Sequence, residues 1–519
     1  MTTAQELLAR EDFGTLSEMV AAHAAERPLH PAVIQDGVTL SYQAFDAHVD
    51  RVAAALKRDG MKPRQSIAIV SATCPDYVVV YAGALRAGLA VAPLPPSATP
   101  EQIAGMAKDS DALHLFLDGA NEAALAGVAA ELPQRRIRLD TDAFERWLAP
   151  EGSKPQPVAI TPDMPFNIIY SSGTTGIPKG IVQPCGMRWL HMQRAVAYGY
   201  DTKAVTLLST PLYSNTTLVS LFPTLAGGGT VLLMAKFDVV KYLELAEKYR
   251  VTHTMLVPVQ YQRIMAHPDF DKYDLSAYRA KFCTSAPFNA ALKADILKRW
   301  PGKLLEFYGM TEGGGTCILI ADEHPDKLHT VGRPAPGHDI RLIDEQGNEL
   351  PPGEVGEIVG HSGAIMTHYH KQPGKTAEAE WFDKTGKRFI RTGDMGRFDA
   401  DGFLQLMDRR KDMIISGGFN IYPSDLEAVL REHPAVFDVA VVGVASEQWG
   451  ETPVAFVVRK ENAATTAPEL LAWANGKLGK MQRLSAIEFR DVLPRSAIGK
   501  VLKRELRDAY AATAAKQSA

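Results

Sequence analysis

Residues 170–180, Tyr-Ser-Ser-Gly-Thr-Thr-Gly-Ile-Pro-Lys-Gly, follow a short apolar run at 166–169. Five hydroxyl side chains, three glycines and a lysine stand within these eleven positions. Backbone N–H and hydroxyl groups at this density are suited to binding phosphate oxygens. A Walker A loop is excluded, because Pro178 precedes Lys179 and Gly180 follows it. The stretch therefore predicts a phosphate-binding loop of another kind, with a glycine-rich surface turn as the alternative.

Strand and helix patterns alternate on both sides of this loop. Short apolar runs predict strands at 66–70, 90–93, 113–117, 205–209, 230–234, 254–257, 281–284 and 304–308, with helical patterns between them. This alternation is typical of parallel sheets covered by helices. From Gly332 on, short strands broken by glycine and proline replace it. We therefore expect an α/β fold with a large N-terminal domain of helix-covered sheets at 1–410, including a β-rich subdomain at 332–410.

Residues 411–519 carry a second, smaller pattern of helices and strands. Helices are predicted at 424–432 and 467–478, and strands at 436–444 and 452–458. This pattern predicts a small, mobile α+β domain at the C-terminal end. Because no long glycine- or serine-rich linker precedes it, we expect a tight hinge at Lys411 rather than a flexible tether.

The composition is that of an ordinary globular enzyme. The 519 residues exceed the size of a single hydrophobic core, so at least two domains are expected. The 56 basic and 60 acidic side chains give a net charge of -4, without the basic excess of a nucleic-acid-binding protein. The widely spaced Cys74, Cys185, Cys283 and Cys317 argue against a disulfide framework or a zinc site. Neither a signal peptide nor a membrane-spanning apolar run is visible, so a cytoplasmic enzyme is expected.

A second motif, Tyr308-Gly309-Met310-Thr311-Glu312, places an aromatic ring, a hydroxyl and a carboxylate beside further glycines. A purine ring can stack on Tyr308, and Thr311 can contact a phosphate. Glu312 offers the hard oxygen ligand that Mg²⁺ prefers. The alternative interpretation is a turn after a buried strand.

Two further motifs lie nearer the C-terminus. The carboxylate of Asp394 can accept hydrogen bonds from both ribose hydroxyls, and Arg409 could close the same site. A solvated charge run beside a hairpin is the alternative for this pair. Lys500 follows a glycine, where it could neutralise a carboxylate and an α-phosphate as they react.

Together the four motifs, in this order and over essentially the whole chain, resemble those of the adenylate-forming superfamily of acyl-CoA synthetases, adenylation domains and luciferases. The resemblance implies a nucleotide site. Its residues would be Ser171, Thr174, Thr175 and Lys179 around the phosphates, Tyr308 on adenine, Thr311 on phosphate, Glu312 on Mg²⁺, and Asp394 and Arg409 on ribose. It also implies a hinge at Lys411 and a catalytic Lys500 that is needed for adenylate formation. Glu357 matches a further motif whose expected role is structural.

The implied activity is that of an ATP-dependent carboxylic acid–CoA ligase. A carboxylate attacks the α-phosphate of ATP to give an acyl-adenylate and pyrophosphate, and the CoA thiol then displaces AMP. The small domain is expected to rotate between these steps, so that the loop at Gly417 and Gly418 lines a tunnel for the pantetheine arm. The implied cofactors and co-substrates are ATP, Mg²⁺ and coenzyme A.

The same resemblance implies an acyl pocket. Its residues would be Tyr213, Asn215, Thr216, Val257, Thr284, Ser285, Ala286, Met310, Gly313 and Gly314, with Ser285 and Ala286 also serving the nucleotide. They are mostly small or apolar, and no Arg or Lys is evident to hold a second carboxylate, which disfavours a dicarboxylic acid. The small residues Ala286 and 313–315 leave space for an aromatic acid of the benzoate or hydroxycinnamate type or for a medium-chain fatty acid, and the aromatic acid is favoured. Ser214 stands where many family members carry histidine.

Other functions are also compatible with these motifs. The chain could load a separate carrier protein, act as a luciferase-like oxygenase, or be an inactive ATP-binding module. Competent residue types at every nucleotide position argue against the inactive module. The expected partners are the acid, ATP and CoA, without nucleic acid. A homodimer and a lysine acetyltransferase acting on Lys500 are also considered.

Overall fold

The computed structural model describes residues 3–171, 178–409, 412–416, 419–446, 449–461, 463–479, 482–496 and 499–517. The chain divides into two compact units. The first unit comprises Met1–Ile340 with Gly360–Ile390, and the second comprises Arg341–Val359 with Arg391–Ala519. Lys411 lies outside the described residues, so the hinge expected there, with its domain boundary, stays a prediction. None of the described helices is long and apolar enough to cross a membrane.

A nine-stranded sheet forms one part of the first unit, in the order β15-β14-β13-β12-β11-β9-β10-β1-β2. Its strands are β1 (Pro31–Gln35), β2 (Val38–Ser41), β9 (Val205–Leu208), β10 (Thr230–Leu233), β11 (His253–Leu256), β12 (Ala280–Cys283), β13 (Lys303–Tyr308), β14 (Cys317–Ile320) and β15 (Arg333–Pro334). The six strands from β13 to β1 are paired in parallel, and antiparallel strands stand at both edges. The parallel strands are almost completely buried, which explains their continuous apolar sequences.

A seven-stranded sheet forms the other part of the first unit, in the order β18-β8-β7-β4-β3-β5-β6. Its strands are β3 (Ser66–Val70), β4 (Ala90–Pro93), β5 (Ala112–Leu117), β6 (Arg135–Arg138), β7 (Pro165–Ser171), β8 (Lys179–Pro184) and β18 (His368–Tyr369). Strands β3 to β7 are parallel, whereas β8 and β18 are antiparallel additions at one edge. The α/β class expected from the alternation is therefore confirmed.

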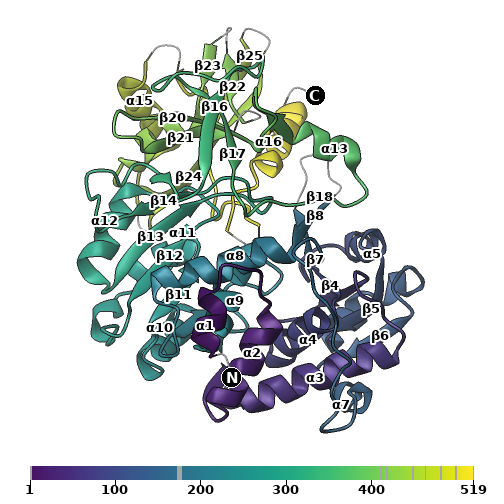
Figure 1. Ribbon diagram of the computed structural model, residues 1–519. Coiled ribbons are helices and arrows are strands. Elements are labelled where there is room, and N and C mark those ends of the chain that lie inside the picture. The colour runs from purple at the N-terminus through teal and green to yellow at the C-terminus, as the bar shows by residue number, and fades with distance from the viewer. Residues whose placement is uncertain are drawn as a thin grey trace. The chain divides into compact units, whose positions relative to one another are not determined.

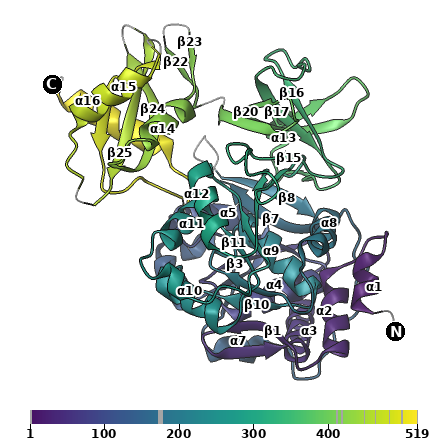
Figure 2. The ribbon, with the colours of Figure 1, turned by 90° about the vertical axis from the view of Figure 1, so that its left-hand side faces the viewer.

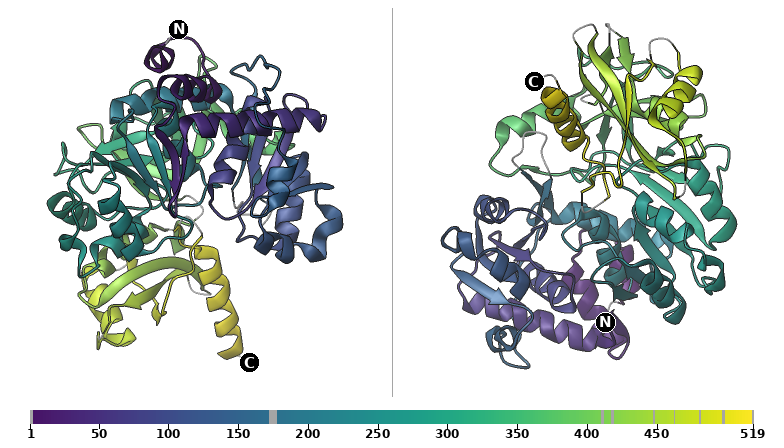
Figure 3. Two further views of the ribbon diagram at one scale, coloured as in Figure 1. Left: turned by 90° about the horizontal axis from the view of Figure 1, so that it is seen from below. Right: turned by 180° about the vertical axis from the view of Figure 1, so that it is seen from behind.

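Helices cover both sheets of the first unit. They are α1 (Ala4–Ala9), α2 (Leu16–Glu26), α3 (Tyr42–Arg58), α4 (Pro75–Arg86), α5 (Pro100–Asp109), α6 (Gly119–Ala124), α7 (Asp142–Trp147), α8 (Cys185–Ala195), α9 (Asn215–Ala226), α10 (Val239–Lys248), α11 (Pro258–Met265), α12 (Ala290–Arg299) and α13 (Pro373–Glu378). The purple helices of the N-terminal region gather on one side of this unit, where α2, α3 and α4 contact one another (Figure 3). Helices α8 and α9 lie side by side near its middle (Figure 1).

Local sequence signals explain several of these boundaries. The hydroxyl of Ser41 accepts the N–H of Ala44 over 3.2 Å and caps the start of α3, a role that serine commonly has at a helix N-terminus. One of the helical patterns expected between the strands, at 122–130, is interrupted in the structure, because α6 ends at Ala124 and a 3₁₀ helix follows at Ala126–Glu131. Gly127, in the middle of the expected helix, has a low intrinsic preference for an α-helix and agrees with this break.

A five-stranded sheet lies within the range 332–410 that was expected to be β-rich. Its strands are β16 (Asp339–Ile343), β17 (Gly356–His361), β19 (Glu380–Phe382), β20 (Arg388–Phe398) and β21 (Leu404–Arg409). The remainder of the second unit has another five-stranded sheet, made of β22 (Ile414–Ser416), β23 (Phe419–Ile421), β24 (Val436–Ser446), β25 (Gly450–Arg459) and β26 (Ala486–Phe489). Its helices are α14 (Pro423–Arg431), α15 (Ala467–Lys477) and α16 (Lys503–Gln517), as Figure 2 shows.

Strand β24 is buried on both faces of the last sheet. Val439 and Val441 pack with Leu426 of α14 and Leu470 of α15. The intervening Ala440 and Val442 pack on the other side in the cluster that contains Leu506 of α16. Because side chains alternate between the faces of a strand, the continuous apolar run at 439–442 requires helices on both sides. The C-terminal helix α16 supplies the second cover, although the sequence pattern did not predict it.

Candidate active site

The phosphate-binding loop predicted at 170–180 connects the antiparallel strands β7 and β8. At the base of this connection, Ser171 pairs with Lys179 and Tyr170 with Gly180. The Tyr170 hydroxyl donates to Asp109 Oδ2 over 2.7 Å and so ties the end of β7 to α5. The loop therefore begins and ends on a fixed hairpin. Thr174 and Thr175 lie outside the described residues, and their phosphate contacts remain predictions.

Tyr369 joins the lysine of this loop to the carboxylate of the second motif. The Lys179 Nζ atom lies 4.8 Å from the centroid of the Tyr369 ring. On its other side, the Tyr369 hydroxyl donates to Glu312 Oε1 over 2.7 Å. Burial, together with the neighbouring Glu312 charge, raises the pKa of Tyr369, so this hydroxyl keeps its proton and acts as a donor. Lys179, which the sequence predicts at the phosphates, and Glu312, which it predicts on Mg²⁺, are thereby brought together by a tyrosine that it did not single out.

The second motif forms the connection between β13 and β14, with Tyr308 at the end of β13. Glu312 is buried, and its backbone oxygen accepts the N–H of Met366 over 2.7 Å. Gly313 and Gly314 have φ values of +72° and +85°. A Cβ atom on Gly313 would stand 2.2 Å from the Ala364 oxygen, and one on Gly314 would stand 2.6 Å from the Gly360 oxygen. Only glycine fits both positions.

This packing corrects one interpretation of the sequence. The glycines at 313–315 were expected to leave space for the acid, but the place of each missing side chain is already occupied. Backbone atoms of 360–364 fill it beside Gly313 and Gly314, and Ile340 Cδ1 would stand 1.9 Å from a Cβ on Gly315. The small residues therefore allow a close approach of two protein segments, and their presence is no measure of the size of the acyl pocket.

The N-terminus of α9 carries several of the predicted acyl-pocket residues. Ser214 is its N-cap, and the Ser214 hydroxyl accepts the Thr216 N–H over 3.3 Å. This gives the serine a capping role at the position where many family members have histidine. Tyr213 is half-buried, and burial raises the pKa of its hydroxyl. Val257 is buried at the start of α11.

A hydroxyl pair links α9 to the loop that follows β12. The oxygens of Thr216 and Ser285 are 2.7 Å apart, and the Thr284 hydroxyl donates to the Phe307 oxygen over 2.8 Å. Ser285 has a φ of +82°, a conformation that is rare for a residue with a side chain and is concentrated at functional sites. Ala286, in the loop that follows β12, and Met310, in the connection between β13 and β14, are both half-buried. The structure thus brings Asn215, Thr216, Thr284 and Ser285 into one wall.

Sequence reasoning missed two residues behind this wall. Gln183, at the end of β8, donates from Nε2 to the Thr311 oxygen over 2.5 Å. Arg188, on α8, donates from Nη2 to Asn215 Oδ1 over 2.8 Å and also to Gln183 Oε1. Neither residue belongs to a motif, and no sequence signal connects a position on α8 with Asn215 on α9. Their roles depend on the packing of these two helices.

The second unit contains the predicted ribose residues. Asp394 on β20 and Arg409 on β21 are direct partners in the antiparallel register. The Asp394 N–H donates to the Thr392 hydroxyl over 3.0 Å, and Arg391 Nε donates to Glu357 Oε1 over 3.2 Å. Glu357 thus forms an ion pair with Arg391 on β20, the strand that also carries Asp394. This agrees with the structural role expected for Glu357. Gly417 and Gly418 lie outside the described residues.

Lys500 also belongs to the second unit, where it ends a tight loop. Its N–H donates to the Ser496 hydroxyl over 3.2 Å, and its carbonyl accepts the Ser496 N–H over 2.8 Å. The preceding Gly499 has a φ of +76°, which explains the glycine before this lysine. Arg495 clamps the loop, because it donates to the Gly499 oxygen and, over 2.6 Å, to Asp438 Oδ2 on β24. The backbone that presents Lys500 is thus held on the sheet of its own unit.

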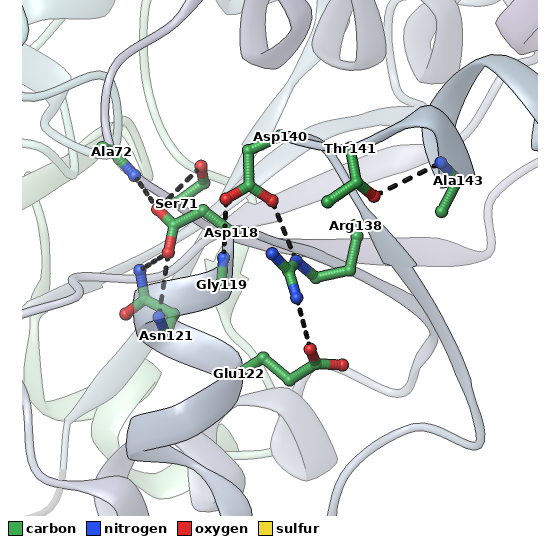
Figure 4. A network of polar contacts seen from close by, with 10 residues as sticks. All are labelled: Ser71, Ala72, Asp118, Gly119, Asn121, Glu122, Arg138, Asp140, Thr141 and Ala143. Atoms are coloured by element: carbon green, nitrogen blue, oxygen red, sulfur yellow. Dashed lines mark hydrogen bonds and ion pairs between the residues drawn. The ribbon is translucent and has the colours of Figure 1, made fainter.

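A further polar cluster stands at the carboxyl ends of β3, β5 and β6, an edge where open α/β sheets often bind ligands (Figure 4). Asp118 accepts from the Ala72 N–H over 2.7 Å and from the Ser71 hydroxyl over 3.1 Å. Arg138 bonds to Asp140 and Glu122 over 2.8 and 2.6 Å. The carboxylates at this edge are thus engaged by the protein's own donors.

The metal-binding capacity of the site depends on Glu312. Among the residues that the structure describes, no group of three or more His, Cys, Asp or Glu side chains is arranged to hold a metal ion. Mg²⁺ is commonly bound by one or two carboxylates, with substrate phosphates and water as the remaining ligands. One buried carboxylate, oriented by Tyr369, therefore fits a magnesium ion that arrives with a nucleotide.

Comparison with known proteins agrees with this geometry. The family model described as AMP-binding enzyme matches residues 20–370, and that described as AMP-binding enzyme C-terminal domain matches residues 425–500. The chain is 30% identical over 506 residues to a fatty acid–[acyl-carrier-protein] ligase, ScoC, from Streptomyces coeruleorubidus, with 96% of each protein covered. It is 33% identical to a feruloyl-CoA synthase from Amycolatopsis sp, covering 92% of this chain and 96% of that protein.

A solved structure shows the same architecture. The crystal structure of ATP-bound MatB from Rhodopseudomonas palustris superimposes with a TM-score of 0.86 and 29% identity, covering 95% of this chain and 99% of that one. The chain thus matches both family models and resembles relatives over their full length. The same chain contains the hairpin loop, the motif around Glu312 and the loop of Lys500. This protein belongs to the family of AMP-binding enzymes.

Proposed function

We propose that this protein is an ATP-dependent carboxylic acid–CoA ligase that works through an acyl-adenylate. The observation that carries the proposal is the arrangement of Lys179, Tyr369 and Glu312 at the base of the phosphate loop, where Lys179 lies over the Tyr369 ring and the Tyr369 hydroxyl donates to Glu312. It occurs in a chain with full-length similarity to acid–thiol ligases. The reaction uses ATP with Mg²⁺ and then coenzyme A, and it releases pyrophosphate and AMP.

In the first half-reaction, an oxygen of the acid forms a bond to the α-phosphorus, and the bond from that phosphorus to the pyrophosphate oxygen breaks. Residues Ser171, Thr174, Thr175 and Lys179 are proposed to hold the leaving phosphates. Glu312 is proposed to hold the magnesium ion, whose charge neutralises the phosphates, with Thr311 as a phosphate contact. Lys500 is proposed to stabilise the charge that develops on the α-phosphate.

In the second half-reaction, the CoA sulfur forms a bond to the acyl carbon, and the bond from that carbon to the AMP oxygen breaks. AMP leaves as the second product. The proposed nucleotide contacts are adenine on Tyr308, with Ser285 and Ala286 in the same region, and ribose on Asp394 and Arg409. Gly417 and Gly418 are proposed to leave room for the pantetheine arm.

The proposed acid is aromatic, of the benzoate or hydroxycinnamate type, with a medium-chain fatty acid as the alternative. The similarity to a feruloyl-CoA synthase supports the first class, and that to a fatty acid–[acyl-carrier-protein] ligase supports the second. AMP formation with CoA should therefore be measured for benzoates, hydroxycinnamates and C4 to C12 fatty acids. We expect AMP in amounts equal to the thioester with at least one class. A failure of every acid to yield AMP or pyrophosphate would contradict the proposal.

A carrier protein is the alternative acceptor. The 30% identity with a fatty acid–[acyl-carrier-protein] ligase over 506 residues is the specific observation that favours it. The two acceptors are separated by supplying preformed acyl-adenylate with either CoA or a phosphopantetheinylated carrier protein. If the thioester forms only on the carrier protein, the carrier replaces CoA as the proposed acceptor. The proposed adenylation half-reaction then stands unchanged. An inactive ATP-binding module would release neither AMP nor pyrophosphate.

Tyr369→Phe is predicted to weaken the use of Mg²⁺ without unfolding the protein. The substitution removes the hydroxyl that donates to Glu312 Oε1, so the carboxylate loses its orientation. Loss of such a supporting hydrogen bond typically lowers metal affinity by a factor of about 10 to 100. Magnesium titration of pyrophosphate release should show this shift, with Tyr249→Phe, just after the end of α10, as a control. An unchanged magnesium dependence would show that Tyr369 does not orient the ligand.

Three further proposals concern the protein in its cell. Acetylation of Lys500 would remove the positive charge proposed to act on the α-phosphate, so a lysine acetyltransferase would switch off adenylate formation. A homodimer and a cytoplasmic location are proposed as the setting of the enzyme. Mass spectrometry of Lys500 from growing cells tests the first of these proposals, and unmodified Lys500 under all growth conditions would count against it.

A further inference from the structure

A buried cation without a carboxylate partner lies on α8. Arg188 is 1% exposed, and its guanidinium carbon is 5.8 and 5.9 Å from the ring centroids of Phe166 and Phe222. In the part of the chain that the structure describes, Arg188 forms no ion pair, and Nε and Nη1 have no hydrogen-bond partner. Its acceptors are two neutral amides, those of Gln183 and Asn215. A buried charge is normally paired, so this arrangement calls for a functional reason.

Arg188 determines which way both amides face. A guanidinium group only donates hydrogen bonds, so each amide must turn its carbonyl oxygen toward it. Gln183 is therefore left with its Nε2 donor for the Thr311 oxygen, which it contacts over 2.5 Å. Asn215 turns Oδ1 to Arg188, over 2.8 Å, and its Nδ2 group faces elsewhere. The first residue of α9 thus presents an oriented N–H donor.

The position of Asn215 places this donor in the predicted acyl-pocket wall. Asn215 is half-buried rather than enclosed, and the next residue, Thr216, is bonded to Ser285 over 2.7 Å. Gln183 connects the same group to Thr311, a residue of the motif proposed to contact phosphate. Arg188 itself is too deeply buried to touch a ligand. It acts through the two amides that it orients.

The next turn of α8 is also polar on this side. His191 is three residues after Arg188 and is half-buried. Its Nδ1 atom has no hydrogen-bond partner among the described residues. Burial, with the charges of Arg188 and Arg194, lowers the pKa of His191 to about 3, so the imidazole is neutral at physiological pH. Arg194 in turn contacts His338. Arg188, His191 and Arg194 therefore form a row of polar and positively charged side chains along α8.

We propose that Asn215 Nδ2 recognises an oxygen acceptor on the acid, remote from the reacting carboxylate, and that Arg188 is the positioning residue that orients this donor. The inference rests on the proposed ligase function and narrows its substrate to oxygen-bearing acids. A plain hydrocarbon would leave the donor unpaired once water is expelled, and a site built to hydrogen-bond a substrate group discriminates strongly against acids that lack it. The positive charge of Arg188 further favours an electron-rich oxygen, such as a phenolic oxygen or a second carboxylate. The second of these would reverse the expectation from the sequence, which showed no Arg or Lys at the acyl pocket.

Two matched pairs of acids test the proposal. Each pair differs only in the remote oxygen: 4-hydroxycinnamate with cinnamate, and adipate with hexanoate. For the wild type we expect kcat/KM to be at least about tenfold higher for the oxygen-bearing member of one pair. The pair with the larger ratio identifies the phenolic oxygen or the carboxylate as the acceptor. Ratios near one in both pairs would overturn the proposal.

Variants of the two residues separate recognition from stability. Arg188→Met and Asn215→Leu should both lower the ratio of the two kcat/KM values toward one, because the contact with the remote oxygen is lost. Arg188→Lys keeps a donor-only cation and should retain part of the preference. Arg250→Met, on an exposed ion pair with Asp274, is the control and should leave the ratio unchanged.

Stability and binding give independent measurements. Since Arg188 has no charge partner, Arg188→Met should melt at the wild-type temperature or above it. An equal loss of activity on both members of a pair, with a lower melting temperature, would overturn the positioning role and make Arg188 a structural residue. Calorimetric binding of the same acids without ATP measures the preference even where no AMP forms. A binding preference without turnover would therefore contradict the ligase function and leave the recognition of the oxygen supported.

Discussion

We expect Lys500→Ala to slow acyl-adenylate formation by a factor of about 10² to 10³, the range typical for loss of one group that stabilises transition-state charge. The variant should still convert preformed acyl-adenylate and CoA to the thioester at a rate close to that of the wild type. Lys500 is presented by a loop that Arg495 holds to Asp438, so removal of the side chain beyond Cβ should not disturb the backbone. Pyrophosphate release and thioester formation, measured separately, check this expectation.

The reverse pattern is expected for Gly418→Leu. A leucine side chain would obstruct the tunnel proposed for the pantetheine arm, so thioester formation should slow while pyrophosphate release persists. The expectation rests on the sequence, because Gly418 lies outside the described residues. Lys477→Ala, which removes an exposed ion pair with Glu432 in the same unit, is the control and should affect neither step. Equal loss of both steps in both variants would contradict a two-position mechanism.

The second large effect concerns stability. Lys293→Met is expected to lower the free energy of unfolding by about 3 to 5 kcal/mol, because it leaves a buried carboxylate without its counter-charge. Lys293 on α12 is 1% exposed and forms an ion pair with Glu306 on β13, which is 4% exposed. Its Nζ atom also donates to the Leu328 and Thr330 oxygens over 2.8 and 3.1 Å. Calorimetric melting of the purified variant measures the loss.

A double variant distinguishes charge from packing in this pair. Lys293→Met combined with Glu306→Leu removes both charges, so much of the lost stability should return. If the double variant is no more stable than Lys293→Met, the loss reflects packing of α12 on β13 rather than an unpaired charge. An unchanged melting temperature in the single variant would contradict the prediction altogether.

Lys293 and Arg188 are both buried cations, yet opposite results are expected from the same substitution. Lys293 has a carboxylate partner, so its loss uncovers a charge. Arg188 has only the amides of Gln183 and Asn215, so its loss removes a charge that the protein does not balance. A stability penalty at Lys293 and a change of substrate preference at Arg188 would separate a structural cation from one retained for recognition.

Much of the fold could be predicted from local patterns. The strands expected at 66–70 and 90–93 coincide with β3 and β4, because each is a short apolar run that is buried on both faces. Ser41 marks the start of α3 because a hydroxyl at that position satisfies a backbone N–H that the helix leaves free. Patterns of this kind act over a few residues, which the sequence displays directly.

The site could be predicted less completely. The motifs around Lys179 and Glu312 were visible, since glycines, hydroxyls and charged residues are concentrated in a few positions. The tyrosine between them was not, because Tyr369 is 57 residues from Glu312 and belongs to a two-residue strand on β8. The glycines at 313–315 were misinterpreted for the same reason, since the backbone that fills their space comes from a distant segment.

The sequence by itself determined most of the alternation of strands and helices, the position of the predicted phosphate loop after an apolar run, and the residue types of a nucleotide site. Tertiary structure alone decided that α8 packs on α9, that Arg188 turns the amide of Asn215, and that Tyr369 orients Glu312. The physical reason is that hydrogen bonding between distant residues depends on the packing of whole elements. Local patterns specify those elements but not the contacts made between them.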